Sequence, residues 1–284
     1  MRMPTPKNEP TRIWPSAKAG LPDTDNLTLS PHVQSPAMID TTLEEASSAT
    51  STAPNHSPVS TSLPHYMTEV YDWAYVSPRW VPKLDNNLVV KLLLFGNDQR
   101  LMRAYLSRIQ PGMRVWQLAH VYGDLVRRAA QKCGGADGKQ GHFTLTDVTP
   151  IQLAQASHKL ADLPNVTQQR ADAAHYRSSE KQDLICSFFL LHEVPDHWKR
   201  QIVDNMLSQL EPGAEAFFVD YHGPAKWQPV RYILKWVNRL LEPFAESLWE
   251  NEISSFAAHA EDFVWEKRTI FGGVYQIVSV KHKP

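Results

Sequence analysis

Cysteine is scarce in this chain. Its 284 residues include only two cysteines, Cys133 and Cys186, and no CxxC pair. This scarcity excludes a disulfide framework and a thiolate zinc site, and it fits a reducing compartment. We expect both thiols to be inert.

The chain also lacks an excess of one charge and any long apolar run. The formal net charge is −1 and the pI is about 6.9. Nucleic-acid-binding domains are usually strongly basic, so this balance predicts no nucleic-acid partner. The longest apolar stretches, near 184–191 and 216–219, are too short to cross a bilayer. We therefore expect no membrane-spanning helix.

Residues 1–64 contain few large apolar side chains and are rich in Ser, Thr and Pro. They bury too little surface to offset the entropy of ordering, which predicts a disordered tail. The tail lacks the layout of a secretory signal, and its acidic residues disfavour an organelle transit peptide. An interaction tail and a lineage-specific extension are both open alternatives. A single domain is expected over 65–284, beginning with helices within 65–110.

The start of this domain is aromatic. Residues 66–75 suit a helix that folds across a ligand pocket, with ordinary core packing as the alternative. Helices are also predicted at 88–95, which a glycine ends, and at 100–109.

From residue 114 the chain alternates between strands and helices. The strands are expected at 114–118, 142–147, 166–170, 184–190 and 216–219, and the helices at 123–132, 150–161 and 197–210. Pro212-Gly213 predicts a turn, and residues 265–270 and 274–281 predict an antiparallel hairpin around Phe271-Gly272-Gly273. The pattern predicts an α/β, Rossmann-like fold: a mostly parallel seven-stranded sheet with a C-terminal hairpin and helices on both faces. Residues 223–260 form a mostly helical, aromatic-rich insertion suited to covering an apolar substrate.

Glycine is missing where such a fold needs it most. The turn after the first strand reads Val115 to Asp124 and contains one glycine, Gly123. Glycine is favoured there because a residue without Cβ lets backbone N–H groups close on a ligand. We therefore expect any nucleotide cofactor to bind in a position that differs from the usual one in such folds.

The order and spacing of residues 110–284 resemble the class I S-adenosylmethionine-dependent methyltransferases. Several strings resemble more narrowly the rhodoquinone biosynthesis family RquA; they span 121–125, 188–196, 219–222, 241–244 and 271–276. The resemblance implies an enzyme that converts ubiquinone to rhodoquinone by replacing a ring methoxy group with an amino group. It also implies S-adenosylmethionine as the amino donor and a requirement for Mn²⁺. The alternatives are a conventional methyltransferase acting on a quinone or other small molecule, and a non-catalytic scaffold that binds quinone or cofactor.

The resemblance assigns the modified turn to the cofactor. Gln117 stands where methyltransferases carry an acidic residue, and Ala119 and Val121 stand at two glycine positions, before Gly123. A side chain at Val121 occupies space that the methionine part of the cofactor normally uses, and Gln117 removes a negative charge. Because methyl transfer tolerates little misplacement, this change is expected to silence methylation and to present the amino group instead.

Two acidic residues follow the next strands. Asp147 is expected to bind the ribose hydroxyls and Asp172 the adenine amino group. The alternative for Asp147 is a helix cap.

Four residues are candidate catalytic groups. His120 is expected to accept a proton from the attacking ammonium, with a surface histidine as the alternative. Tyr122 is expected to orient the amine or to stack on the quinone. Asp124 is expected to bind the amine or a metal, with capping as the alternative. His192 is expected to face the substrate.

A hard Mn²⁺ ion prefers carboxylate oxygen and accepts imidazole, which makes Glu193, Asp220 and His222, with His120, the candidate ligands. The metal would polarise a quinone carbonyl while the amine adds and methoxide leaves. The alternative for the pair His192-Glu193 is a structural or substrate contact without metal.

The prenyl tail of the implied substrate is insoluble, so we expect peripheral association with a membrane surface. The segment from Trp227 to Trp249 combines aromatic and basic side chains as an interface requires, although an amphipathic core helix has the same composition. The expected location is cytoplasmic at the inner membrane, or on the matrix side of the mitochondrial inner membrane in a eukaryote. The sequence gives no basis for predicting an oligomeric state.

Overall fold

A computed structural model describes residues 79–242 and 244–284 of the chain. The predictions for the tail at 1–64 and for the aromatic segment at 66–75 lie outside the described residues.

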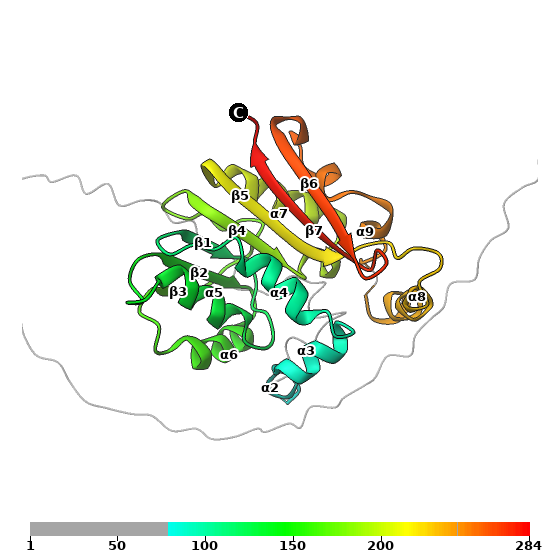
Figure 1. Cartoon of the computed structure of the whole chain (residues 1–284), viewed down its shortest axis with the longest axis horizontal. Helices are drawn as coiled ribbons and strands as arrows, with labels where there is room; N and C mark the ends of the chain where they lie inside the picture. The colour runs from blue at the N-terminus through cyan, green and yellow to red at the C-terminus, as the bar shows by residue number, and fades with distance from the viewer. Residues whose placement is uncertain (1–78, 243) are drawn as a thin grey trace, which may run out of the picture. The chain divides into compact units, whose positions relative to one another are not determined.

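A seven-stranded sheet forms the centre of the fold, in the order β3-β2-β1-β4-β5-β7-β6 (Figure 1). The strands are β1 (Arg114–Gln117), β2 (His142–Asp147), β3 (Val166–Arg170), β4 (Gln182–Phe188), β5 (Leu210–Tyr221), β6 (Phe263–Ile270) and β7 (Tyr275–His282). The first five run parallel, and β7 is antiparallel to both β5 and β6. The predicted fold class is confirmed.

Helices cover both faces of the sheet. One face packs against α4 (Asp98–Leu106), α5 (Leu125–Gly134), α6 (Pro150–Leu160) and α8 (Val230–Leu241), and the other against α7 (Asp196–Ser208), α9 (Ser247–Glu250) and the 3₁₀ turn η3 (Ile253–Phe256). Successive strand residues divide between the two faces: Val115 joins the first hydrophobic cluster and Trp116 the second. Burial on both sides explains why the strands read as continuous apolar runs.

Short elements complete the described chain. They are α2 (Val81–Leu84), α3 (Asn87–Leu93) and the 3₁₀ turns η2 (Leu191–Glu193) and η4 (Ala260–Asp262). Helix α2 has no counterpart in the sequence predictions. Among the described residues, no helix is both long enough and apolar enough to cross a membrane.

The expected turn at Pro212-Gly213 is wrong, because both residues lie inside β5. The pairing of β4 with β5 moves from Gln182–Leu210 to Leu184–Glu215, so β5 carries extra residues as a bulge. Gly213 has φ +81°, a value that favours glycine. A bulge therefore absorbs the Pro-Gly pair without ending the strand.

Both cysteines are free and buried. Burial raises the pKa of Cys133 to about 12 and that of Cys186 well above its usual value. Protonated, enclosed thiols agree with the predicted lack of reactivity.

Candidate functional site

The carboxyl ends of β1, β2, β3 and β4 enclose a pocket. Residues that line it include Ala119, His120, Asp147, Asp172, Phe189 and Glu193. Open α/β sheets bind their ligands at this edge. Three of the predicted cofactor residues, Ala119, Asp147 and Asp172, therefore lie together in one pocket.

Two other predicted cofactor residues lie elsewhere. Gln117 is fully buried, and its Nε2 donates to the carbonyl oxygen of Ala119 at 3.2 Å. Val121 packs against the core cluster on the α5 side of the sheet and does not line the pocket. Val121 therefore lies outside the pocket, and the modified turn is filled by other residues.

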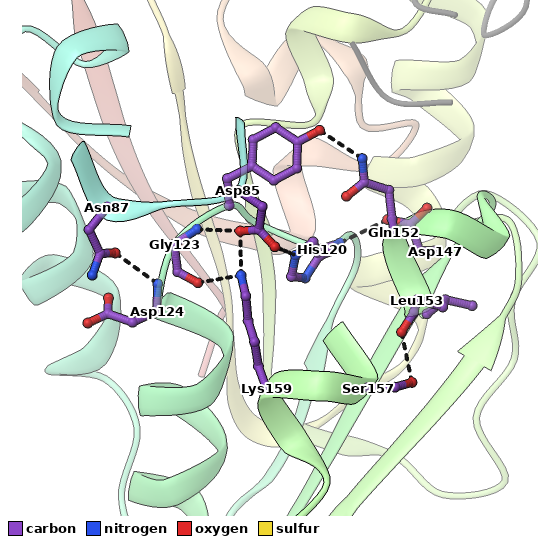
Figure 2. A network of polar contacts seen from close by, with 11 residues as sticks. Asp85, Asn87, His120, Gly123, Asp124, Asp147, Gln152, Leu153, Ser157 and Lys159 are labelled. Atoms are coloured by element: carbon purple, nitrogen blue, oxygen red, sulfur yellow. Dashed lines mark hydrogen bonds and ion pairs between the residues drawn. The ribbon is translucent and has the colours of Figure 1, made fainter. Parts of the chain in front are cut away.

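A buried carboxylate from the segment before α3 fills this turn (Figure 2). One oxygen of Asp85 accepts hydrogen bonds from the backbone N–H of Gly123 at 2.8 Å and from Lys159 Nζ. Its other oxygen lies 3.2 Å from His120 Nε2. Lys159 also donates to the carbonyl oxygen of Gly123 at 2.6 Å. The Asp85 side chain is only 1% exposed, so this is an enclosed network rather than a surface ion pair.

The next amide along the turn is also occupied. The N–H of Asp124 donates to Asn87 Oδ1 at 3.0 Å. Amides at the start of a helix attract anions, and those of Gly123 and Asp124 open α5. Here the chain supplies its own acceptors, Asp85 and Asn87. A ligand carboxylate can reach these amides only by displacing them.

Asp85 holds a negative charge in this position. Burial alone would raise the pKa of its carboxyl group, but the hydrogen bonds and charges of His120 and Lys159 outweigh burial and lower it. The group is therefore ionised at neutral pH.

Sequence reasoning missed Asp85, Asn87 and Lys159. Asp85 and Lys159 are 74 positions apart. Asp85 belongs to a short polar run in which Asn86 caps α3 by accepting from the N–H of Val89 at 3.0 Å. A polar run of this kind looks like a helix cap and gives no sign of its distant partner.

Substitution of Gly123 by alanine is expected to destabilise the fold by about 1–3 kcal/mol. Gly123 has φ +85°, and a Cβ there would lie 2.5 Å from Asn87 Oδ1. Gly96→Ala is the matched control, because Gly96 has φ +75° and a Cβ there would meet no atom within 4 Å. Chemical denaturation of both variants separates the clash from the backbone strain. Equal losses of stability would show that Asn87 does not press on this turn.

Asp147 joins the second strand to the modified turn. One of its oxygens accepts from the N–H and hydroxyl of Thr149 at 2.8 and 2.7 Å, and the other accepts from the N–H of His120 at 3.0 Å. Burial raises its pKa against these hydrogen bonds. Thr149 is the N-cap residue of α6, so Asp147 organises that helix start as well as lining the pocket. Asp147 is thus not itself the N-cap of α6, and its place in the pocket leaves the ribose prediction open to test.

Asp172 follows β3 at the pocket wall. Its Oδ1 accepts from the N–H of Ala174 at 2.9 Å, and its Oδ2 lies 3.4 Å from His175 Nδ1. The side chain is 24% exposed, which leaves it accessible to a ligand.

His120 is enclosed rather than on the surface. Its side chain is 0% exposed, and its Nδ1 is buried without a hydrogen-bond partner among the described residues. The bond from Nε2 to Asp85 assigns the ring proton of the neutral form to Nε2, which leaves the lone pair on Nδ1. His120 lines the pocket, and the lone pair on its buried Nδ1 is not used by any hydrogen bond among the described residues.

Tyr122 and Asp124 contribute differently. The hydroxyl of Tyr122 accepts from Gln152 Nε2 at 3.0 Å, and burial raises its pKa, so it stays protonated. The ring of Tyr122 meets that of His120 edge-on, with centroids 6.2 Å apart. Asp124 Oδ1 lies 3.8 Å from Arg128 one turn along α5, and its side chain makes no capping hydrogen bond. Tyr122 thus contacts Gln152 and His120 beside the pocket. Asp124, the residue before α5, lies near Arg128 of that helix instead.

A second histidine pairs with a carboxylate at the ends of β4 and β5. His192 Nδ1 lies 2.8 Å from Asp220 Oδ1, and the other oxygen of Asp220 accepts from the N–H of Leu191 at 2.8 Å. Burial lowers the pKa of His192, but Asp220 outweighs it and raises the pKa to about 9. His192 Nε2 lies 3.8 Å from the pocket-lining carboxylate of Glu193. At neutral pH this end of the pocket is therefore backed by an imidazolium.

The predicted metal ligands do not come together. No group of three His, Cys, Asp or Glu side chains that could hold a metal ion occurs within residues 79–242 and 244–284. Asp220 is occupied by His192 and backbone amides, and His222 Nδ1 lies 3.0 Å from the carbonyl oxygen of Gly273. Strand β5 ends at Tyr221, so His222 lies beyond the strand that carries Asp220. These residues do not fit a Mn²⁺ site.

Known proteins resemble this chain in part of its sequence and in its fold. Residues 115–213 match the family model described as a methyltransferase domain. The O-methyltransferase family protein from Burkholderia thailandensis has a similar structure, with a TM-score of 0.52 and 12% identity over 69% of this chain and 57% of that one. The N-methyltransferase NodS from Bradyrhizobium japonicum WM9 is 16% identical over 66% of this chain and 94% of that one, with a TM-score of 0.49. No curated protein matches the chain.

Residues 115–213 are thus similar to a methyltransferase domain. The chain has a Rossmann-like fold, and its pocket lies at the carboxyl edge of the strands, where such sheets bind ligands.

Proposed function

We propose that this chain uses S-adenosylmethionine as an amino donor and converts ubiquinone to rhodoquinone, replacing a ring methoxy group. The sequence strings that resemble the RquA family support the substrate. The occupation of the Gly123 and Asp124 amides by Asp85 and Asn87 supports the change of chemistry. This occupation is the observation on which the proposal rests.

The physical argument concerns the methionine end of the donor. Its carboxylate is attracted to free amides at a helix start, and the amides that open α5 are already bonded within the chain. The donor then binds with this end displaced, and a displacement of about 1 Å from the line of methyl transfer costs on the order of 100-fold in rate. The same displacement brings the amino group, rather than the methyl group, to the acceptor.

The residues of the pocket then supply proton transfer and charge. His120 Nδ1 accepts a proton from the donor ammonium, and Asp85 holds the ring and stabilises its positive charge. The free amine adds to the ring carbon that bears methoxy. The His192 imidazolium lies 3.8 Å from the pocket-lining carboxylate of Glu193 and offsets its negative charge, which lowers the cost of moving electrons onto a quinone oxygen at this end of the pocket. Methoxide leaves and takes up a proton as methanol.

The nitrogen of the product still carries the methionine-derived carbon. Loss of the hydrogen on that carbon, with its two electrons passing to the ring, reduces the quinone to a hydroquinone and leaves a C=N bond, which water hydrolyses to the aminohydroquinone and the 2-oxo acid of the donor. Dissolved oxygen then oxidises the aminohydroquinone to the aminoquinone. The only support for a Mn²⁺ requirement is the resemblance to the RquA family. Because the candidate ligands do not form a metal group, no step above passes through a metal.

The second candidate is a conventional methyltransferase that acts on a quinone or another small molecule, and the match of residues 115–213 to a methyltransferase domain favours it. The two candidates differ in their products. Amino transfer yields an aminoquinone, whereas methyl transfer yields a methylated acceptor and S-adenosylhomocysteine.

Isotope labelling tests the proposal. The chain is incubated with ubiquinone, with and without Mn²⁺, and with S-adenosylmethionine carrying ¹⁵N at its amino group. We expect mass spectrometry to find an aminoquinone that carries the label, and His120→Ala to lower its rate about 100-fold or more through loss of the base. His259→Ala, at a histidine whose side chain is 76% exposed, is the matched control. A methylated acceptor without labelled aminoquinone would establish the second candidate, and cofactor binding without either product would indicate a scaffold.

A further inference from the structure

Exposed large apolar side chains gather in two segments of the described chain. All but one of them lie within residues 80–95 or 227–236: Trp80, Leu88, Leu92, Leu93, Phe95, Trp227, Tyr232, Ile233 and Trp236. The exception is Val264 on β6. Large contiguous apolar surfaces mark sites of interaction with proteins or membranes.

The turn between β6 and β7 joins the two segments. The ring of Phe95 stacks on that of Phe271 with centroids 6.1 Å apart. A Cβ on Gly272 would lie 3.0 Å from the ring of Trp227. In Figure 1, α3 and α8 lie on either side of this turn. We call α3, α8 and the turn at 271–273 the apolar face.

Helix α8 is apolar on two sides. Val230, Leu234 and Asn238 are buried and attach it to the domain. On the other side Tyr232, Ile233 and Trp236 are 69%, 54% and 68% exposed. A helix that only covers a domain carries polar residues on its outer side. The outer side of α8 is therefore suited to a second apolar environment.

The charged side chains around the apolar face indicate what kind of surface it binds. The exposed basic residues there are Arg79, Lys83, Lys91, Lys226, Lys235 and Arg239. Within residues 79–95 and 224–241 the one acidic residue is Asp85, whose carboxylate is enclosed in the network described above. Basic side chains that surround apolar ones match a bilayer containing anionic phospholipid, because their stems lie along apolar surface while their charges reach the headgroups.

A series of aromatic rings connects this face with the pocket. Phe189 lines the pocket, and its ring centroid lies 5.8 Å from that of Tyr275. Tyr275 stacks on Phe271 at 6.2 Å, and Phe271 stacks on Phe95. The rings thus form a continuous aromatic cluster from the pocket wall to the surface.

We propose that the apolar face binds the surface of an anionic phospholipid bilayer, and that the rings from Phe95 to Phe189 receive the apolar tail of a substrate drawn from that bilayer. The second part rests on the proposed function. The first part stands on the surface alone and is tested without turnover.

Vesicle flotation tests the bilayer surface. The full chain is expected to float with vesicles of phosphatidylcholine and phosphatidylglycerol, and much less with phosphatidylcholine alone. Trp236→Ser and Leu92→Ser are each expected to weaken binding about tenfold or more, since each removes one exposed apolar anchor. Lys235→Gln and Arg239→Gln are each expected to weaken it about fivefold.

Two variants outside the apolar face serve as controls. Val264→Ser removes an exposed apolar side chain from β6, and Lys283→Gln removes an exposed charge near the C-terminus; neither is expected to change flotation. Equal flotation of Trp236→Ser and Val264→Ser overturns the proposal. So does light scattering that shows a dimer which Trp236→Ser dissociates while flotation stays unchanged, because a second copy would then cover the face.

Turnover separates the tail route from the proposed function. Trp236→Ser is expected to lower the rate with a long-tailed quinone in vesicles and to leave the rate with a short-tailed soluble quinone unchanged. Equal loss with both quinones overturns the route. Absence of aminoquinone from either substrate with the wild-type chain overturns the proposed function and leaves the flotation result standing.

Discussion

Substitution of Asp85 by asparagine is expected to lower amino transfer about 100-fold or more and to destabilise the fold by about 3–5 kcal/mol. The substitution leaves Lys159 beside Gly123 without its carboxylate, and it removes the acceptor that orients His120. Breaking an enclosed pair is costly because one charge remains without compensation. Chemical denaturation and the labelled-donor assay measure the two effects.

A double variant separates stability from function. Asp85→Asn combined with Lys159→Met removes both charges, which is expected to restore much of the stability. Amino transfer should stay low, since His120 still lacks its carboxylate. Recovery of amino transfer together with stability would reduce the role of Asp85 to holding the fold.

Substitution of Asp220 by asparagine is the second variant expected to have a large effect. It removes the group that raises the pKa of His192, so the enclosed imidazole loses its charge at neutral pH. Amino transfer is expected to fall by roughly 100-fold to 10,000-fold, the usual range for loss of a positioned acid or base. Asn keeps an acceptor for the N–H of Leu191, so the end of β5 should remain intact. Activity close to wild type would contradict a role for the charged ring.

The same pair predicts how stability depends on pH. The folded-state pKa of His192, about 9, lies above its ordinary value of 6.5, so the folded chain holds the proton more tightly. The resulting stabilisation, on the order of 3 kcal/mol, is fully present below about pH 6.5 and is lost as pH rises through about 9. Denaturation at several pH values should show this loss in the wild type and in His259→Gln, and not in Asp220→Asn. A pH dependence that Asp220→Asn leaves unchanged would show that another group is responsible.

The fold could be predicted because its signals are local. Apolar runs bounded by turn residues gave the strands, and their alternation with helices gave the parallel sheet. The turn predicted at Pro212-Gly213 was wrong because a glycine with positive φ, such as Gly213, occurs in a β-bulge as well as in a turn. Local sequence does not distinguish these two uses of glycine.

The site could be predicted only in part. Strand ends mark the pocket, so Asp147, Asp172 and His120 were found from their positions alone. The missing glycines indicated the turn before α5 as unusual, and there Val121 packs against the core. The side chain that fills this turn is Asp85, whose partners come from α6 and the turn before α5. Contacts across such distances follow from tertiary packing, which a single sequence does not display.

The conformation of a bound cofactor product tests the central claim most directly. A crystal structure of the chain with S-adenosylhomocysteine is predicted to keep Asp85 on the N–H of Gly123 and Asn87 on the N–H of Asp124, with the carboxylate of the ligand bound elsewhere. A complex in which that carboxylate replaces Asp85 and Asn87 at these two amides would contradict the account.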